Sequence, residues 1–142
     1  MMTADPMPEP RSDAQRRPLS PHLSIYRPTL TMMMSIAHRI TGSALYFGMA
    51  LLALWLLAAA SGEQAFATAQ AIVASWPGQI VLFLFTWALM HHMLGGVRHL
   101  IWDTGHGFSR PAIEFLGRAT LIGGILLTAL IWIAAFFFRG GL

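Results

Sequence analysis

The stretch ALMHHMLGGVRHLIWD, residues 88–103, stands at the end of an apolar run that begins near Gly78. No charged residue occurs between Gly78 and Val97, and a helix needs about 20 residues to cross a bilayer. The second half of that helix then carries three histidines and an arginine. Ionisable side chains at membrane depth are costly and usually face a protein interior. We therefore expect a membrane-spanning helix with a functional site in its second half.

Helical spacing divides the polar residues of this stretch between two neighbouring faces. One face carries His92, Gly96, His99 and Asp103. The other carries His91, Gly95, Arg98 and Trp102. On each face a glycine removes side-chain bulk, so that a flat group could lie against the backbone. At ~1.5 Å per residue, His92 lies about 16 Å from Asp103 and about 21 Å from Gly78, close to mid-membrane.

Spacing alone leaves two interpretations of these faces open. A neutral imidazole at that depth beside a glycine is suited to be an axial ligand of haem iron. Arg98 and His99, about one and a half to two turns nearer the surface, could then meet the haem propionates. In the other interpretation the histidines hydrogen-bond a neighbouring helix and the glycines permit close helix packing.

The composition places the 142-residue chain in a membrane, because 56% of its residues are hydrophobic and only 11% are charged. The absence of cysteine excludes disulfides, iron–sulfur ligation and thiol catalysis within the chain. The net charge of +3 does not indicate nucleic-acid binding, because the arginines flank apolar spans. No nucleophile–base pair, phosphate loop or flavin fingerprint occurs, so we predict no catalytic residue in this chain.

Two further apolar segments predict two more membrane helices, which makes the fold class an all-α membrane protein of three transmembrane helices. The predicted spans are about 31–60, 78–102 and 119–138. The 61–77 connection suits a short interfacial helix over 65–75, and residues 103–118 are expected to form a polar loop. Residues 1–30 are predicted to be a surface segment on the cytoplasmic side, with about the first 15 residues disordered.

A polar cluster is also expected where the first span begins. Ser35, His38 and Arg39 are spaced i, i+3 and i+4, hence on one helix face. Such a cluster could hold the carbonyl end of a quinone or a carboxylate at membrane-surface depth. The alternative is an interfacial arginine that snorkels to water and a serine that the helix tolerates.

The distribution of arginine predicts the orientation. Arginines occur in the N-terminal segment and in the 103–118 loop but not in the 61–77 connection, so the positive-inside rule places the first two in the cytoplasm. The acidic residues Asp5, Glu9 and Asp13 are untypical of a mitochondrial presequence. We therefore favour a bacterial inner membrane over a mitochondrial one, with the N-terminus cytoplasmic.

Three motifs carry a family resemblance. The segments RPLSPHL (17–23), SIAHRITG (35–42) and HMLGGVRHLIWD (92–103) occur in this order. They resemble the N-terminal signature, the S-I-x-H-R-x-[ST]-G motif and the H-x3-G-x-R-H-x3-D motif of the cytochrome b556 subunits of succinate dehydrogenase. The resemblance runs through all three spans, over about residues 17–138.

The resemblance implies a haem role for the histidines and Arg98. His92 would be this chain's axial ligand to haem b, the other ligand coming from a second membrane-anchor subunit. His38, Arg98 and His99 would lie in the vicinity of the haem propionates. His91 has no counterpart in the motif and is left out of the ligand set. The chain would thus be half of a heterodimeric haem-binding helical anchor.

The resemblance also implies a quinone site and soluble partners. Ser35 and Arg39 would line a ubiquinone site, and Asp103 would belong to the cytoplasmic rim facing the iron–sulfur subunit. Electrons from a flavoprotein subunit would reach quinone through that iron–sulfur subunit. The alternatives are a haem-free anchor that only docks the soluble subunits, and a small transporter subunit whose histidines relay protons or bind metal.

Overall fold

The computed structural model describes residues 27–140, and within that range the regular structure is helical throughout. The helices are α2 (Leu30–Ala60), α3 (Glu63–Ala74), α4 (Trp76–Asp103) and α5 (Arg110–Gly140). Three of them, α2, α4 and α5, are long and apolar enough to cross a membrane. The prediction of an all-α protein with three membrane helices is therefore confirmed. The disorder predicted for the first residues lies outside the described range.

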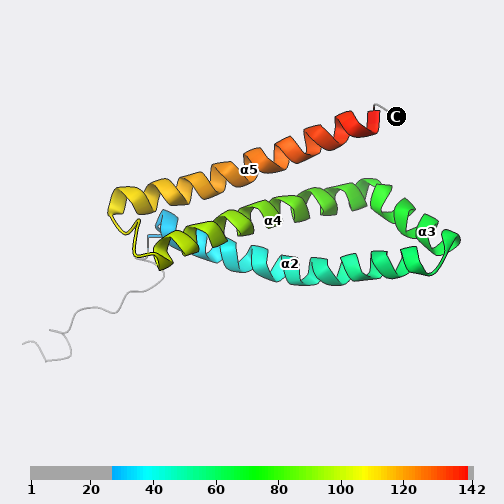
Figure 1. Ribbon diagram of the computed structural model, residues 1–142, viewed down its shortest axis with the longest axis horizontal. Helices are drawn as coiled ribbons and strands as arrows, with labels where there is room; N and C mark the ends of the chain where they lie inside the picture. Colours follow the sequence, from blue (N-terminus) through cyan, green and yellow to red (C-terminus); the bar gives the residue numbers. More distant parts are fainter. Residues whose placement is uncertain (1–26, 141–142) are drawn as a thin grey trace, which may run out of the picture.

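The three long helices run side by side, with the start of α2, the end of α4 and the start of α5 at one end (Figure 1). The short helix α3 joins α2 to α4 at the other end, where the indole nitrogen of Trp55 donates to the Gln70 side chain at 3.2 Å. A short helix was expected over 65–75, and α3 is that helix at 63–74, while its interfacial location stays a prediction. The polar ends of α2 and α4 therefore come together, which brings the two sequence motifs to the same region.

Local sequence explains where the helices begin and end. Gly62, at φ 113°, takes a conformation that favours glycine and ends α2. The Ser75 hydroxyl accepts a bond from Gly78 N at 3.3 Å, and Pro77 lies in the first turn of α4, where a missing N–H costs nothing.

The third long helix begins earlier than expected. The sequence predicted a polar loop over 103–118, but α5 begins at Arg110 and only residues 104–109 connect it to α4. Ser109 receives bonds at the helix start, from Ala112 N to its hydroxyl at 3.4 Å and from Ile113 N to its carbonyl at 2.9 Å. The prediction was wrong here because charged residues mark where the membrane ends, and a helix can continue beyond that point.

The interior between the helices consists mainly of small and polar side chains. The buried positions are Met34, Thr41 and Gly48 on α2; Ala88, His91, Gly95 and Arg98 on α4; and Gly117, Thr120, Gly124 and Thr128 on α5. Small residues let helix backbones approach closely where lipid removes the hydrophobic driving force. Thr120 and Thr128 donate their hydroxyl protons to carbonyls of their own helix, at 2.8 and 2.7 Å. Most large apolar side chains instead face outward, as a lipid environment requires.

Gly48 offers a test of this close packing. A Cβ at this position would overlap the ring of Phe85 on α4. We expect Gly48→Ala to lower the free energy of unfolding of the chain in detergent by about 1–3 kcal/mol, the usual cost of overpacking. Thermal or SDS denaturation measures the change, with Gly96→Ala as the control, because a Cβ there meets nothing within 4 Å. Equal stability of the two variants would contradict the packing described here.

Candidate functional site

Three imidazoles gather where α2 crosses α4. The ring of His38 on α2 stacks on the ring of His92 on α4, with centroids 3.9 Å apart and planes 4° from parallel. The ring of His99, two turns further along α4, lies 5.3 Å from His38. A Cβ at Gly95 would overlap the His38 ring, so this glycine makes room for the α2 histidine. Two motifs that are far apart in the sequence thus form one cluster.

The two ring nitrogens of His92 have different surroundings. Its Nδ1 lies 3.1 Å from the carbonyl oxygen of His38 and 3.5 Å from the hydroxyl of Thr41. Its Nε2 has no hydrogen-bond partner within residues 27–140 and is not enclosed by them, since it is absent from the buried polar atoms that lack a partner. A carbonyl oxygen only accepts, so Nδ1 carries the proton and the lone pair is on Nε2.

Ser35 and Arg39 are exposed on α2, one turn apart. Neither side chain bonds to another residue in the described part of the chain, 27–140. Their spacing of four residues corresponds to about 6 Å along the helix axis. His38 lies between them in sequence and is half-buried against α4. The start of α2 therefore presents a cation and a hydroxyl next to the histidine cluster.

The face of α4 that carries His91 and Arg98 points into the interior of the three helices. His91 is 1% exposed, its backbone lies against Gly124 of α5, and neither ring nitrogen has a partner within the described range. Arg98 is 5% exposed, and its guanidinium carbon lies 5.1 Å from the centre of the Trp102 ring. Arg98 therefore lies on the buried face of α4, whereas His92 is only half-buried and His99 is exposed.

Asp103 is the last residue of α4 and is exposed at the same end as Ser35 and Arg39. The loop that follows it turns at Gly105 and Gly107, with φ of 80° and 81°. Within this loop the Nδ1 of His106 donates to the Thr104 carbonyl at 2.9 Å. Asp103 therefore lies where the membrane-length helix α4 ends and the polar 104–109 loop begins.

Two residues of the site were missed in the sequence. Thr41 is 3% exposed and contacts His92, and a Cβ at Gly42 would lie 2.9 Å from the Cε1 atom of the same ring. Both follow His38 at i+3 and i+4, hence on the same face of α2. That spacing was visible in SIAHRITG and would have pointed to them.

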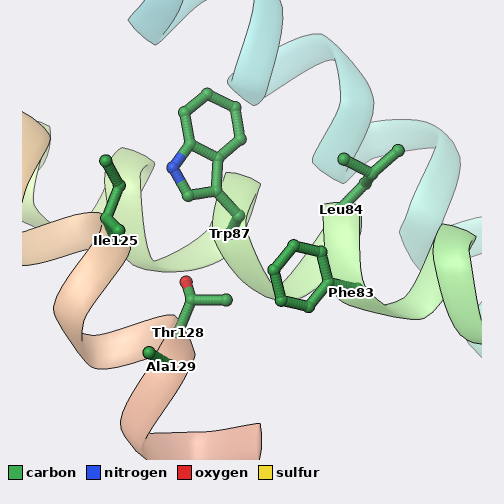
Figure 2. Close-up of a pocket in the computed structure, with 6 residues that line it drawn as sticks. All are labelled: Phe83, Leu84, Trp87, Ile125, Thr128 and Ala129. Atoms are coloured by element: carbon green, nitrogen blue, oxygen red, sulfur yellow. The ribbon is translucent and has the colours of Figure 1, made fainter.

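A separate apolar cavity of about 310 Å³ lies between α4 and α5. Figure 2 shows Phe83, Leu84 and Trp87 of α4 facing Ile125, Thr128 and Ala129 of α5. The Thr128 hydroxyl gives its proton to the Gly124 carbonyl at 2.7 Å, and the remaining lining is apolar apart from the indole N–H of Trp87. Hydrocarbon suits this cavity better than a polar head group.

Known proteins resemble this chain over almost its whole length. The family model described as succinate dehydrogenase/fumarate reductase transmembrane subunit matches residues 13–138. The succinate dehydrogenase cytochrome b556 subunit of Paracoccus denitrificans is 43% identical over 86% of this chain and 94% of its own length. That of Rickettsia typhi is 38% identical over 83% of this chain and 92% of its own length.

A mitochondrial relative is more distant. The succinate dehydrogenase cytochrome b560 subunit of Mus musculus is 34% identical over 82% of this chain and 70% of its own length. The three helices long and apolar enough to cross a membrane agree with the description of this family as a transmembrane subunit. The chain therefore belongs to the family of succinate dehydrogenase cytochrome b556 subunits, among the succinate dehydrogenase/fumarate reductase transmembrane subunits.

Proposed function

We propose that this chain, together with a second membrane-anchor chain, binds haem b and ubiquinone and passes electrons from the iron–sulfur subunit to quinone. The observation that carries the proposal is the state of His92. Its Nδ1 is engaged by the His38 carbonyl, while Nε2 has no hydrogen-bond partner within residues 27–140. An imidazole held in this way is suited to ligate iron, because ligating histidines usually donate their other N–H to a fixed acceptor.

The surroundings of His92 also fit a haem. His38 stacks on the face of the His92 ring, which leaves the in-plane lone pair of Nε2 unobstructed by that contact. His38 and His99 are the cluster members nearest to the membrane surface and suit the propionates. Arg98, buried beside Trp102, supplies a fixed positive charge at the same end. A bound haem would supply a one-electron store, and a histidine of the second anchor chain would be its other ligand.

Ser35 and Arg39 are proposed to bind the head of ubiquinone. The Ser35 hydroxyl donates a hydrogen bond to a quinone carbonyl. The guanidinium of Arg39 stabilises the negative charge that develops on the oxygen as electrons arrive, because a fixed cation needs no reorganisation at that moment. Since both side chains lie at the polar end of the helices, protons reach the quinone from the aqueous side.

The end of the molecule that carries Asp103 also suggests where the soluble subunits dock and on which side of the membrane they lie. Asp103 and the 104–109 loop form the rim on which the iron–sulfur subunit docks, carrying the flavoprotein subunit with it. The arginine counts support a cytoplasmic side for this end and for the N-terminus, and the relatives from Paracoccus denitrificans and Rickettsia typhi support a bacterial inner membrane. The apolar outer surface of the three helices meets lipid and the second anchor chain.

One observation favours a second candidate, a haem-free anchor. His92 already packs on His38 and bonds to its carbonyl, so it has a structural role without any iron. A dithionite-reduced minus oxidised spectrum of the affinity-purified complex, with haem quantified per copy of this chain, separates the two. We expect one low-spin b-type haem per chain. A complex that reduces quinone but shows no haem absorption would establish the haem-free anchor instead.

A further inference from the structure

The surface of α2 beneath His92 is shaped to hold that ring in one orientation. Three contacts with the ring come from the SIAHRITG segment, within about one helical turn. The His38 carbonyl lies 3.1 Å from Nδ1, the Thr41 hydroxyl lies 3.5 Å from the same atom, and Gly42 leaves the space beside Cε1 open. Each contact is made by α2, whereas His92 belongs to α4.

The hydroxyl of Thr41 has its own proton committed elsewhere. It lies 2.8 Å from the Ala37 carbonyl and 3.0 Å from the His38 carbonyl, and it can donate only to these acceptors. The hydroxyl oxygen therefore turns a lone pair toward Nδ1 and acts as a second acceptor for that N–H. Thr41 also helps to fix the position of the His38 carbonyl, because both groups lie within one turn of the same helix.

We propose that Thr41 is a positioning residue for the haem ligand and that Thr41, with the open space at Gly42, makes α2 set the tautomer and tilt of His92. The inference rests on the proposed function, since it assigns the ring as an iron ligand. Two acceptors at Nδ1 make the imidazole a stronger electron donor through Nε2. A stronger donor stabilises ferric over ferrous haem and so lowers the reduction potential.

The test is a potentiometric titration of haem b in the purified complex carrying Thr41→Val. Valine keeps the shape of threonine and removes the acceptor. We expect the ferric-to-ferrous ratio at a fixed potential to fall about threefold, which is a rise of roughly 30 mV at about 59 mV per tenfold change for one electron. Thr41→Ser keeps the hydroxyl and should restore the original potential.

The matched control is Thr128→Val. Thr128 is equally buried and bonds only within its own helix, to the Gly124 carbonyl. Its loss should leave the potential unchanged. A structural effect of removing a buried hydroxyl would move both variants, whereas the proposed role moves Thr41→Val alone. If Thr41→Val titrates like the unmodified complex, or if Thr128→Val shifts equally, the inference is wrong.

Gly42→Ala tests the space beside the ring without touching either acceptor. The added Cβ would lie 2.9 Å from Cε1, closer than real contacts, so the ring must tilt. We expect altered g values in the low-spin electron paramagnetic resonance spectrum and weaker haem retention, by about 10-fold as for other outer partners of a metal ligand. Unchanged g values and unchanged haem retention would contradict the role of Gly42 in setting the tilt of the His92 ring.

The outcomes also separate this inference from the proposed function. An unmodified complex without haem would overturn the haem part of the proposed function, and the inference with it. An unmodified complex with haem, whose signals ignore both Thr41→Val and Gly42→Ala, would leave the proposed function standing and overturn the inference alone.

Discussion

His92→Ala is expected to leave the succinate dehydrogenase complex assembled but to remove haem b. The substitution deletes the ligand and also the ring that packs on His38. Loss of an outer partner of a metal ligand already lowers metal affinity by about 10- to 100-fold, so loss of the ligand itself should cost at least that. The measurement is haem per copy of this chain in the purified complex, by pyridine haemochrome. Unaltered haem content would refute the ligand assignment.

The neighbouring histidine supplies the control for this prediction. His91→Leu removes an imidazole at the next position, but one that is buried against α5 with neither nitrogen paired in the described range. Leucine fills a similar volume and removes two unpaired polar atoms, so we expect wild-type haem content and no loss of stability. If His91→Leu loses haem as His92→Ala does, both histidines have a structural role, and the assignment of His92 as the iron ligand is not supported.

Arg39→Ala is expected to lower succinate-to-quinone turnover by about 10²- to 10³-fold, the usual cost of removing one preorganised charge-stabilising group. Ser35→Ala should lower it by about fivefold, because a neutral hydrogen bond contributes roughly 1 kcal/mol. Reduction of a soluble artificial acceptor should survive in both variants, since the soluble subunits do not use these side chains. The ratio of the two activities is the measurement.

Arg118→Gln is the matched control for charge at the polar end of the helices. Arg118 is exposed and, among residues 27–140, pairs only with Glu114, at 3.0 Å and one turn away on α5. Its removal should change neither activity, because exposed pairs of this kind contribute little. Equal loss of both activities in Arg39→Ala would point to damaged assembly and count against the quinone role.

His91 and His92 are neighbours in the sequence, but their side chains have different surroundings in the structure. The motif includes His92 and not His91, so it could not predict what surrounds His91. Spacing placed His91 and His92 on adjacent stripes, each followed by a glycine. In the structure, His91 is buried in the interior of the three helices, and His92 lies at the crossing with α2. Arg98 went with His91, although the motif groups it with His99. Of the two glycines, Gly95 makes room for His38 of α2, whereas a Cβ at Gly96 would meet nothing within 4 Å; Gly124 of α5 makes room for His91.

The sequence by itself determined that the chain has three membrane helices, and it identified the residues of the haem and quinone hypotheses. The length of a membrane span and the position of a charge along it can be read from consecutive residues, because the thickness of the bilayer sets how many apolar residues a helix needs to cross it. Only the tertiary structure decided that Thr41 and Gly42 support His92, that Arg98 is buried, and that α5 begins at Arg110. One residue rotates a side chain by about 100° around a helix axis, so what each face meets depends on how the helices pack.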